Sequence, residues 1–184
     1  MQQEPRDNFF TELLKFVIVA ALIVFPIRFF VAQPFIVSGA SMEPTFESGQ
    51  YLIIDELSYR IAPPERGDVV IFRYPRNPKE FFIKRIIALP GETLYIQKGD
   101  VSVKKTSGEV VSLNEPYVAN PGNGNNATYV VGSDEYFVMG DNRPESSDSR
   151  VWGMLPREDI VGRAFLRLLP FNTSAFLPGD SAPQ

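Results

Sequence analysis

The feature that most constrains this chain is a long apolar stretch near its N-terminus. The twelve residues from Phe16 to Ile27 carry no charge, and the wider interval from Phe9 to Ile27 is interrupted mainly by Glu12 and Lys15. A helix that crosses a bilayer needs about 20 residues. The wider interval has that length if its two charged side chains lie in the headgroup region, where lysine can snorkel. The sequence therefore predicts a single uncleaved membrane anchor, with residues 1–33 forming a tail and this anchor.

Pro26 and Arg28 mark the far end of the predicted anchor, and Pro34 favours an extended chain beyond it. Two other interpretations fit the same residues. One is a cleavable signal peptide, because residues 38–40 (Ser-Gly-Ala) imitate a small-x-small cleavage site. The bulky residues 29–37 argue against it, since they make the gap between the apolar core and that site long. The other is a buried core helix of a soluble protein.

The remainder of the chain shows short runs rich in β-branched and aromatic residues, separated by Pro, Gly and Asp. No helical period appears outside the anchor. The predicted fold is therefore mainly β, an antiparallel β-sheet peptidase domain over residues 34–184 behind one N-terminal transmembrane helix. From Pro170 onward we expect a loose tail. The predicted strands are Tyr51–Leu57, Asp68–Tyr74, Phe81–Leu89, Thr93–Gln97, Val101–Lys105, Glu109–Leu113, Tyr129–Val131, Glu135–Met139 and Ile160–Leu169.

The chain contains no histidine and no cysteine. The missing cysteines exclude a thiol nucleophile, disulfides and thiolate metal sites. The missing histidines exclude a Ser-His-Asp triad and a histidine-based zinc hydrolase. A hydrolase of this composition must use Lys, Asp, Glu or Tyr as its base. The formal net charge of -4 argues against a protein that binds nucleic acid, which would normally present a basic face.

Small residues surround a serine in the run from Ser38 to Thr45, where Ser41 is followed by Met and precedes Pro-Thr. Small neighbours let a substrate backbone approach the hydroxyl closely. They also leave backbone N–H groups free to face an oxyanion. Ser41 is therefore a candidate nucleophile, although local composition alone favours a polar turn between the membrane and the first strand.

Lys84 lies within the apolar run from Phe81 to Leu89. Side chains alternate along a strand, so Lys84 shares a face with Phe82 and Arg85 points to the other face, towards a salt bridge or solvent. A free lysine has a pKa of ~10.4, and burial lowers that pKa because it disfavours the charged form. A neutral amine could take the proton of the Ser41 hydroxyl. The alternative is a snorkelling lysine on an edge strand.

A third segment, from Met139 to Gly153, is dense in polar residues. The expected structure is a turn-rich loop in which Asp and Arg pair with each other, so Asp148 and Arg150 are better scaffolding than catalysts. A calcium loop is disfavoured because the spacing of its acidic residues does not match an EF-hand. The sequence implies no metal and no cofactor.

Six short motifs, in this order behind an N-terminal anchor, resemble the bacterial type I signal peptidase family. No single motif is specific, but the ordered set is, and the resemblance extends from the anchor to about Ala164. The motifs are Ser-Met-x-Pro-Thr at 41–45, Arg-Gly-Asp-Val-Val-Ile-Phe at 66–72, Ile-Lys-Arg at 83–85, Leu-Pro-Gly-Glu at 89–92, Gly-Asp-Asn-Arg at 140–143 and Asp-Ser-Arg-x-Trp-Gly at 148–153.

The resemblance implies catalysis by a Ser–Lys pair, with Ser41 as nucleophile and Lys84 as base. Ser146 matches the family serine that hydrogen-bonds and orients this lysine. Asp148 and Arg150 match a structural ion pair beside the site. The backbone N–H of Ser41 would bind the oxyanion.

Two positions depart from the pattern of many family members. Some members have a second oxyanion donor, a serine hydroxyl two residues before the nucleophile. Here that position is Gly39, and either Ser38 or a water molecule could take its place. Phe82 replaces a tyrosine that is common at its position, and little effect is expected because that residue mostly lines the pocket.

The resemblance also implies the substrate. Phe35, Val37 and Ile83 match residues lining two shallow apolar pockets, which admit alanine and reject larger side chains by steric clash. Small residues are then required one and three positions before the cut. The substrate would bind extended, adding a strand between residues 35–37 and 81–83. The expected partners are preproteins that carry signal peptides and membrane lipid, with no nucleic acid.

We therefore expect a membrane-bound serine endopeptidase that removes signal peptides from exported preproteins through an acyl-enzyme intermediate. It would span the cytoplasmic membrane once, with its catalytic domain on the extracytoplasmic side. This orientation follows mainly from the resemblance, because Arg6 and Lys15 precede the apolar stretch and Arg28 follows it.

Three alternatives share part of this pattern. A self-cleaving Ser–Lys protease related to LexA-like repressors is disfavoured by the anchor and by the absence of a DNA-binding segment. A membrane-tethered β adaptor would bind partners through its apolar face and cleave nothing. An inactive peptidase homologue is disfavoured because the Ser, Lys and Asp-Ser-Arg positions are all occupied.

Overall fold

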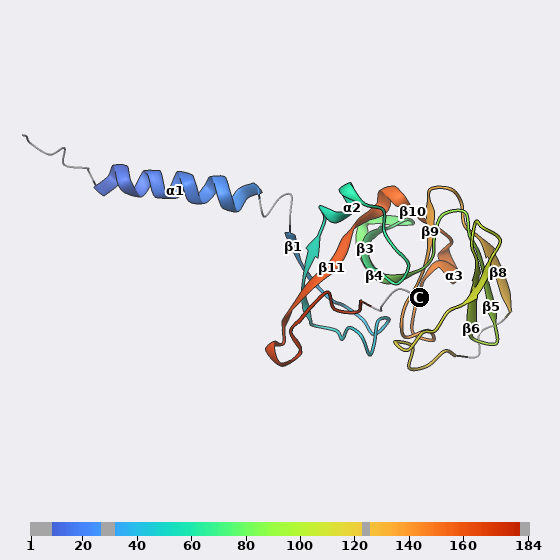
Figure 1. Ribbon diagram of the computed structural model, residues 1–184. Helices are drawn as coiled ribbons and strands as arrows, with labels where there is room; N and C mark the ends of the chain where they lie inside the picture. Colours follow the sequence, from blue (N-terminus) through green and yellow to red (C-terminus); the bar gives the residue numbers. More distant parts are fainter. Residues whose placement is uncertain (1–8, 27–31, 123–125, 181–184) are drawn as a thin grey trace, which may run out of the picture.

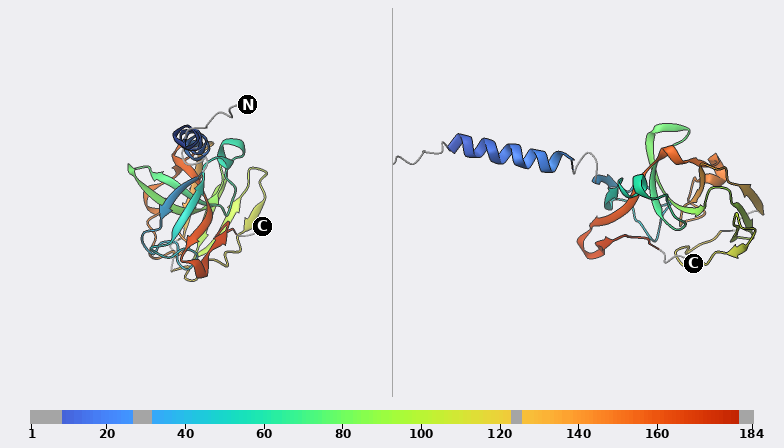
Figure 2. Two further views of the ribbon diagram at one scale, coloured as in Figure 1. Left: turned by 90° about the vertical axis from the view of Figure 1, so that its left-hand side faces the viewer. Right: turned by 45° about the horizontal axis from the view of Figure 1, so that its top comes forward.

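The computed structural model describes residues 9–26, 32–122 and 126–180 of the chain. Its longest helix, α1 (Phe9–Pro26), extends away from the β-sheets in the views of Figures 1 and 2. Residues 1–8 and 27–31, which include Arg28, lie outside the described residues, so the predicted anchor is described only in part.

The apolar side chains of α1 are largely exposed: Phe10 is 80% exposed and Leu22 69%. Glu12 and Lys15 pair on the helix surface, with 2.9 Å between the charged atoms. Within the described ranges, no helix has the length and apolar character that crossing a membrane requires.

The larger sheet has eight strands, ordered β1-β2-β11-β3-β4-β9-β10, with β12 paired to β11. All of its neighbouring pairs are antiparallel. Strand β4 therefore lies in the interior of the sheet, flanked by β3 and β9. The strands are β1 (Ala32–Ile36), β2 (Tyr51–Asp55), β3 (Val69–Tyr74), β4 (Asn77–Ala88), β9 (Glu135–Met139), β10 (Leu155–Pro156), β11 (Ile160–Leu169) and β12 (Ala175–Phe176).

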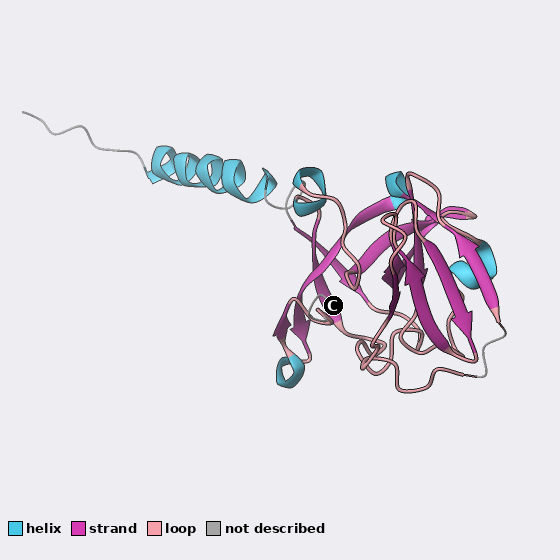
Figure 3. Ribbon diagram, turned by 45° about the vertical axis from the view of Figure 1, so that its right-hand side comes forward, coloured by secondary structure: helices cyan, strands magenta, loops and turns pink. Residues whose placement is uncertain are grey.

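The second sheet is smaller and contains the strands between β4 and β9 in the chain, in the order β7-β6-β5-β8. Short helical turns lie between strands, and Figure 3 shows how strands and loops dominate the molecule outside α1. The strands are β5 (Thr93–Gln97), β6 (Asp100–Lys104), β7 (Val110–Ser112) and β8 (Ala127–Val130), and the helical turns are α2 (Ser58–Ile61), α3 (Ser149–Trp152), η2 (Arg157–Asp159) and η3 (Phe171–Thr173).

Burial alternates along β2, β5, β6 and β11, whereas the central strands β3, β4 and β9 have continuous buried runs. The buried side chains form three apolar clusters. The second sheet packs one cluster with the ends of β4 and β9, around Leu94 and Phe137. A second cluster surrounds Phe72 and Trp152. The third contains Met42, Phe46, Leu52, Ile54 and Ile71, so it underlies the chain between β1 and β2. Each fully buried side chain of this size contributes about 1.5–3 kcal/mol, which holds that connection firmly on the sheet.

The prediction of a mainly β, antiparallel fold is confirmed, and each predicted strand corresponds to an observed one. Strand β1 was not predicted, because Pro34 interrupts the strand pattern. Proline cannot donate a ladder hydrogen bond and is tolerated on an edge strand, and β1 is at the edge of its sheet. The helical turns α2 and α3 were also missed, because four residues are too few to show a helical period.

The prediction of a loose tail from Pro170 is wrong for residues 170–180. This segment forms η3 and then β12, which pairs with β11. The backbone N–H of Leu177 donates to the carbonyl of Phe165 at 2.7 Å. These partners are distant enough in the sequence that local composition carries no sign of them. Residues 181–184 lie outside the described residues.

Candidate active site

Ser41 lies in the connection between β1 and β2. The next residue, Met42, and nearby Phe46 are almost fully buried and anchor this connection in the core. Asn142 holds it from the other side: its backbone N–H donates to the carbonyl of Ser41 and its side-chain amide to the carbonyl of Ala40, both at 3.1 Å. Contacts from a segment far away in the sequence thus fix the position of the serine.

Lys84 lies on β4 and is only 4% exposed. Its Nζ is 2.7 Å from Oγ of Ser41 and 2.8 Å from the carbonyl oxygen of Ile83, both within hydrogen-bond distance. The ring of Phe82 lies beside the amine, with its centroid 5.5 Å from Nζ. The structure therefore brings together the two residues that the sequence predicted as nucleophile and base.

Burial lowers the pKa of Lys84 from its ordinary value of 10.5 to about 8. The neighbouring carboxylates of Asp148 and Asp141 act in the opposite direction, because they favour the charged ammonium. Desolvation outweighs them, so a useful fraction of the amine is neutral near neutral pH. A neutral amine within hydrogen-bond distance of a hydroxyl has the geometry that a general base requires.

Ser146 is buried close to this pair, but it does not make the predicted hydrogen bond to Lys84. Within the described residues, its Oγ has no hydrogen-bond partner. Gly140 allows the close approach: a Cβ at this position would lie 2.3 Å from the carbonyl oxygen of Ser41 and 2.4 Å from Oγ of Ser146. The absence of a side chain at Gly140 is therefore what permits the two serine segments to converge.

We expect Gly140→Ala to lower the rate of cleavage by about 100-fold, because the added methyl group must displace the Ser41 segment or Ser146 and a shift of ~1 Å costs about that much. The matched control is Gly108→Ala, since Gly108 has φ +90° but nothing within 4 Å of an added Cβ. That variant should cleave normally. Wild-type rates for Gly140→Ala would contradict this account of the site.

Asp148 and Arg150 form the ion pair that the resemblance implied, and they organise the loop beside Lys84. Asp148 is fully buried, and its two carboxylate oxygens are each 2.7 Å from the Arg150 guanidinium. Asp148 also accepts from the backbone N–H of Gly140, and Arg150 donates to the carbonyl of Arg143. The pair thus joins the two ends of the loop that carries Ser146.

A second buried ion pair joins Arg85 and Asp141. The sequence predicted a salt bridge or solvent for Arg85 on the face opposite Lys84, but not its partner. Arg85 is fully buried, and its Nε and Nη2 donate to the two carboxylate oxygens of Asp141 at 2.8 and 2.6 Å. The hydroxyl of Thr45 donates to the same carboxylate at 2.5 Å. Asp141 therefore links Arg85, the residue after Lys84, to Thr45, which lies four residues after Ser41. A charged residue inside an apolar strand was the only sequence signal of this link.

Tyr117 packs against the Arg85–Asp141 pair. Its ring centroid lies 3.9 Å from the guanidinium carbon of Arg85. The Tyr117 hydroxyl donates to Glu115, which also pairs with Arg143 at 2.6 Å. Buried charges are expensive unless they are paired and hydrogen-bonded. The charges of Arg85, Asp141, Arg143 and Glu115 are all paired and hydrogen-bonded, so their burial is compensated. This network lies on the face of β4 opposite Lys84.

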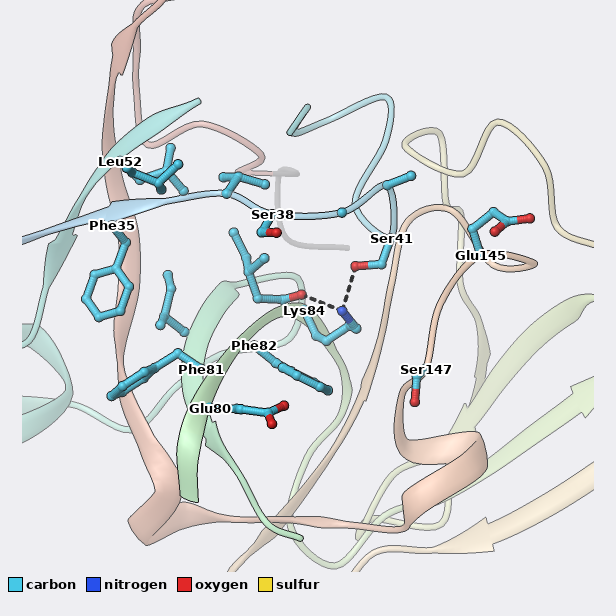
Figure 4. Close-up of a pocket in the computed structure, with 16 residues that line it drawn as sticks. Phe35, Ser38, Ser41, Leu52, Glu80, Phe81, Phe82, Lys84, Glu145 and Ser147 are labelled. Carbon is cyan, nitrogen blue, oxygen red and sulfur yellow. Dashed lines mark hydrogen bonds between the residues drawn. The ribbon is translucent and has the colours of Figure 1, made fainter. Parts of the chain in front are cut away.

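A groove with a volume of about 420 Å³ lies over the Ser41–Lys84 pair. Figure 4 shows Phe35 and Phe81 on one side of the pair and Glu145 and Ser147 on the other. Gly39, which occupies the position of the second oxyanion donor, and Ser38, which was considered as its replacement, also line the groove. The residues predicted to bind substrate are all part of its lining, namely Phe35, Val37, Phe82 and Ile83.

The apolar part of this groove is rigidly built. The rings of Phe35 and Phe81 meet edge to face at 5.3 Å. Phe82 stacks on Tyr74 with the ring centroids 4.5 Å apart. Val37 is 5% exposed and belongs to the cluster beneath the Ser41 segment. The groove lining thus combines these apolar side chains with polar ones, among them Ser38, Lys84 and Glu145. Such a mixed lining suits an extended peptide with small side chains.

Comparison with known proteins agrees with the motifs. The family model described as signal peptidase, peptidase S26, matches residues 10–169. "Probable signal peptidase I-2" of Synechocystis sp. is 38% identical, over 98% of this chain and 83% of that protein. Signal peptidase I of Leptolyngbya laminosa is 37% identical, over 92% of this chain and 85% of that protein. The crystal structure of a signal peptidase I from Enterococcus faecalis is 32% identical, covers 55% of this chain and 97% of that chain, and has a TM-score of 0.48.

The family match covers most of the chain, and the relatives align with nearly all of it. The resemblance inferred from the six motifs is thereby confirmed. The chain belongs to the signal peptidase family, peptidase S26, and is a serine endopeptidase.

Proposed function

We propose that the chain removes signal peptides from exported preproteins, with Ser41 as nucleophile and Lys84 as general base. The observation that carries the proposal is the 2.7 Å contact between Nζ of Lys84 and Oγ of Ser41 at the floor of the groove. The lowered pKa of the buried lysine supports the same assignment.

In the first half of the reaction, neutral Lys84 accepts the hydroxyl proton as Oγ of Ser41 attacks the carbonyl carbon of the scissile bond. The backbone N–H of Ser41 donates to the resulting oxyanion. Lys84 then gives its proton to the leaving nitrogen, and the mature protein departs with a new N-terminal amine. The signal peptide remains as an ester of Ser41.

In the second half, Lys84 accepts a proton from a water molecule as the water oxygen attacks the ester carbonyl. The C–O bond to Ser41 breaks, Oγ of Ser41 regains a proton from Lys84, and the signal peptide leaves with a free carboxyl group. The net reaction is hydrolysis of one peptide bond, and the base returns to its neutral form without a cofactor.

We assign the choice of cleavage site to the apolar part of the groove. A substrate strand between residues 35–37 and 81–83 would place side chains one and three positions before the cut against Phe35, Val37 and Ile83. Phe82 would line the groove next to Lys84. Their bulk leaves room for alanine and excludes larger residues by steric clash.

We assign supporting roles to the loop that follows β9. The Asp148–Arg150 pair would keep this loop closed beside the base, as their buried hydrogen bonds suggest. Ser146 would orient Lys84 once substrate fills the groove, because its buried hydroxyl is close to the pair and has no other hydrogen-bond partner within the described ranges. Hydrogen bonds of catalytic groups often tighten only when substrate is bound.

Membership of the family implies a membrane location. We propose further that the chain before β1 forms a tail and a single anchor, and that the catalytic domain on the extracytoplasmic side of the cytoplasmic membrane begins with β1. The predicted boundary between residues 33 and 34 differs from this by the two residues that open β1. The exposed apolar side chains of α1 support this division. An anchor would hold the groove where signal peptides emerge and raise their effective concentration.

The rate of cleavage should depend on pH through Lys84, which must be neutral to act as a base. Because its pKa is about 8, kcat/KM should rise about tenfold per pH unit below pH 8 and level off above it. A profile measured from pH 6 to 10 checks this result. A midpoint close to 10.5, or a flat profile, would contradict the assignment of Lys84 as the base.

The direct test is cleavage of a model precursor by the detergent-solubilised full chain, followed by sequencing of the new N-terminus. We expect one cut after the final Ala of an Ala-x-Ala site. The matched control precursor carries Phe at the last position and should remain intact. No cleavage by folded protein in lipid or detergent, at any pH up to 10, would refute the proposed function.

A further inference from the structure

We infer that the C-terminal segment from Ala175 to Asp180 positions the Ser41–Lys84 pair from beneath the groove. We call residues 175–180 the C-terminal strap. It lies beyond the residues that the family model matches, which end at 169. The inference rests on the proposed function, since it concerns the same catalytic pair.

The strap is attached to the larger sheet along its first half. Ala175 and Phe176 pair with β11, and the ring of Phe176 meets that of Phe165 edge to face at 4.7 Å. The backbone N–H of Leu177 then donates to the carbonyl of Phe165. These contacts fix the position from which residues 178–180 run towards the core.

The second half of the strap reaches the core at Gly179. The carbonyl of Gly179 accepts a hydrogen bond from Nη1 of Arg85. An added Cβ at Gly179 would lie 3.0 Å from both Thr45 and Phe46 and 3.1 Å from Val69. Gly179 also has φ +85°, a conformation that other residues adopt only with strain. A glycine is therefore required here by both its backbone and its surroundings.

Two of the neighbours of Gly179, Arg85 and Thr45, belong to the segments that carry the catalytic pair. Arg85 follows Lys84 on β4, and Thr45 belongs to the segment that starts with Ser41. Arg85 and Thr45 also bind the same carboxylate, that of Asp141. The strap thus contacts the two segments that carry the nucleophile and the base at the point where they join, while none of its residues lines the groove.

The strap also affects the charge around Lys84. The carboxylates that raise the pKa of Lys84 belong to Asp148 and Asp141, and they are paired with Arg150 and Arg85. Glu80 and Glu145 are the other acidic residues of the groove lining. If the Arg85 guanidinium loses the Gly179 carbonyl and shifts, it neutralises Asp141 less well. Lys84 then holds its proton more tightly and is a poorer base near neutral pH.

The test uses the full chain in detergent with a precursor that carries an Ala-x-Ala site. One variant is Gly179→Ala, and a second ends after Phe176, which keeps β12 but removes Gly179. The matched controls are Gly108→Ala, which has a similar φ but open space around an added Cβ, and a chain that ends after Asp180. For each protein we would measure kcat, KM, the pH profile of kcat/KM and the melting temperature.

We expect both strap variants to lose about tenfold or more in kcat, with KM changed by no more than about twofold, because the reacting groups are misplaced while the groove is intact. The midpoint of the pH profile should move up by about half a unit. An NMR titration of the Lys84 side chain should show the same upward change in its pKa. Both controls should keep the parent's kcat, KM and pH midpoint, although Gly108→Ala should melt at a lower temperature because of the strain at its positive φ.

Two outcomes would overturn the inference. One is parent-like kcat and pH midpoint in both strap variants. The other is a loss of activity that matches the loss of folded protein, with the pKa of Lys84 unchanged, because that result would make the strap a stabilising element only. Failure of the parent chain to cleave would count against the proposed function instead, and the NMR titration would still decide the role of the strap.

Discussion

Lys84→Met and Ser41→Ala are each expected to lower kcat by about 10⁴-fold or more, while the β domain remains folded. General-base catalysis alone accounts for 10²–10⁴, and removal of one member of a nucleophile–base unit costs nearly as much as removal of the whole unit. The two single variants and the double variant should therefore have about the same residual rate.

The Lys84→Met variant separates catalysis from stability. The pKa of Lys84 is lowered in the folded state, so between about 8 and 10.5 the unfolded chain binds more protons than the folded chain. Lys84 therefore lowers the free energy of unfolding at neutral pH, and this cost disappears as the pH rises through that window. Methionine has no such cost, and Lys84→Met should melt at the same temperature as the parent or higher at pH 7.

Thermal melting and single-turnover cleavage check both parts of this prediction. Lys104→Met is the matched control, since Lys104 is exposed on β6 of the second sheet, and it should cleave as the parent does. Substantial activity in a well-folded Lys84→Met variant would show that another group accepts the proton. A large drop in its melting temperature would show that the ammonium is stabilised in the folded state.

Arg85→Ala is expected to lower the free energy of unfolding by about 3–5 kcal/mol, because it leaves the buried Asp141 carboxylate without its partner. Both side chains are at most 1% exposed. For a domain of this size the loss corresponds to a fall of about 10 °C or more in melting temperature. Asp141→Ala should have a comparable effect, since it strands the guanidinium and removes the acceptor of the Thr45 hydroxyl.

A surface ion pair provides the control for this second prediction. Lys105 and Glu109 pair at 3.0 Å with side chains 40% and 60% exposed, and such pairs contribute ~0–1 kcal/mol. Chemical denaturation of Lys105→Ala and Arg85→Ala, side by side, measures the difference. Equal effects for the two variants would mean that the buried network around Asp141 is not a determinant of stability.

Some residues of the candidate site could be predicted from the sequence, and others could not. Ser41 and Lys84 were identifiable, because a lysine in an apolar strand and a serine among small residues are both unusual, and a chain without histidine has few other bases. The contact of Ser146 was predicted but is not formed with Lys84 in this structure. Asp141 was noted only as part of the Gly-Asp-Asn-Arg motif, with no role assigned, although it joins the segments that carry Ser41 and Lys84.

The sequence by itself determined the mainly β fold and the positions of most strands, because runs of β-branched and aromatic residues between turn residues leave a local pattern. It also identified Ser41 and Lys84 as the candidates for the catalytic pair, through the ordered motifs that resemble the family. Only the tertiary structure decided which groups Arg85 pairs with and where the C-terminal strap lies. The partners of Arg85 are 56 residues away at Asp141 and 94 residues away at Gly179. A buried charge must find its partners wherever the fold supplies them, and no local pattern encodes contacts across that much chain.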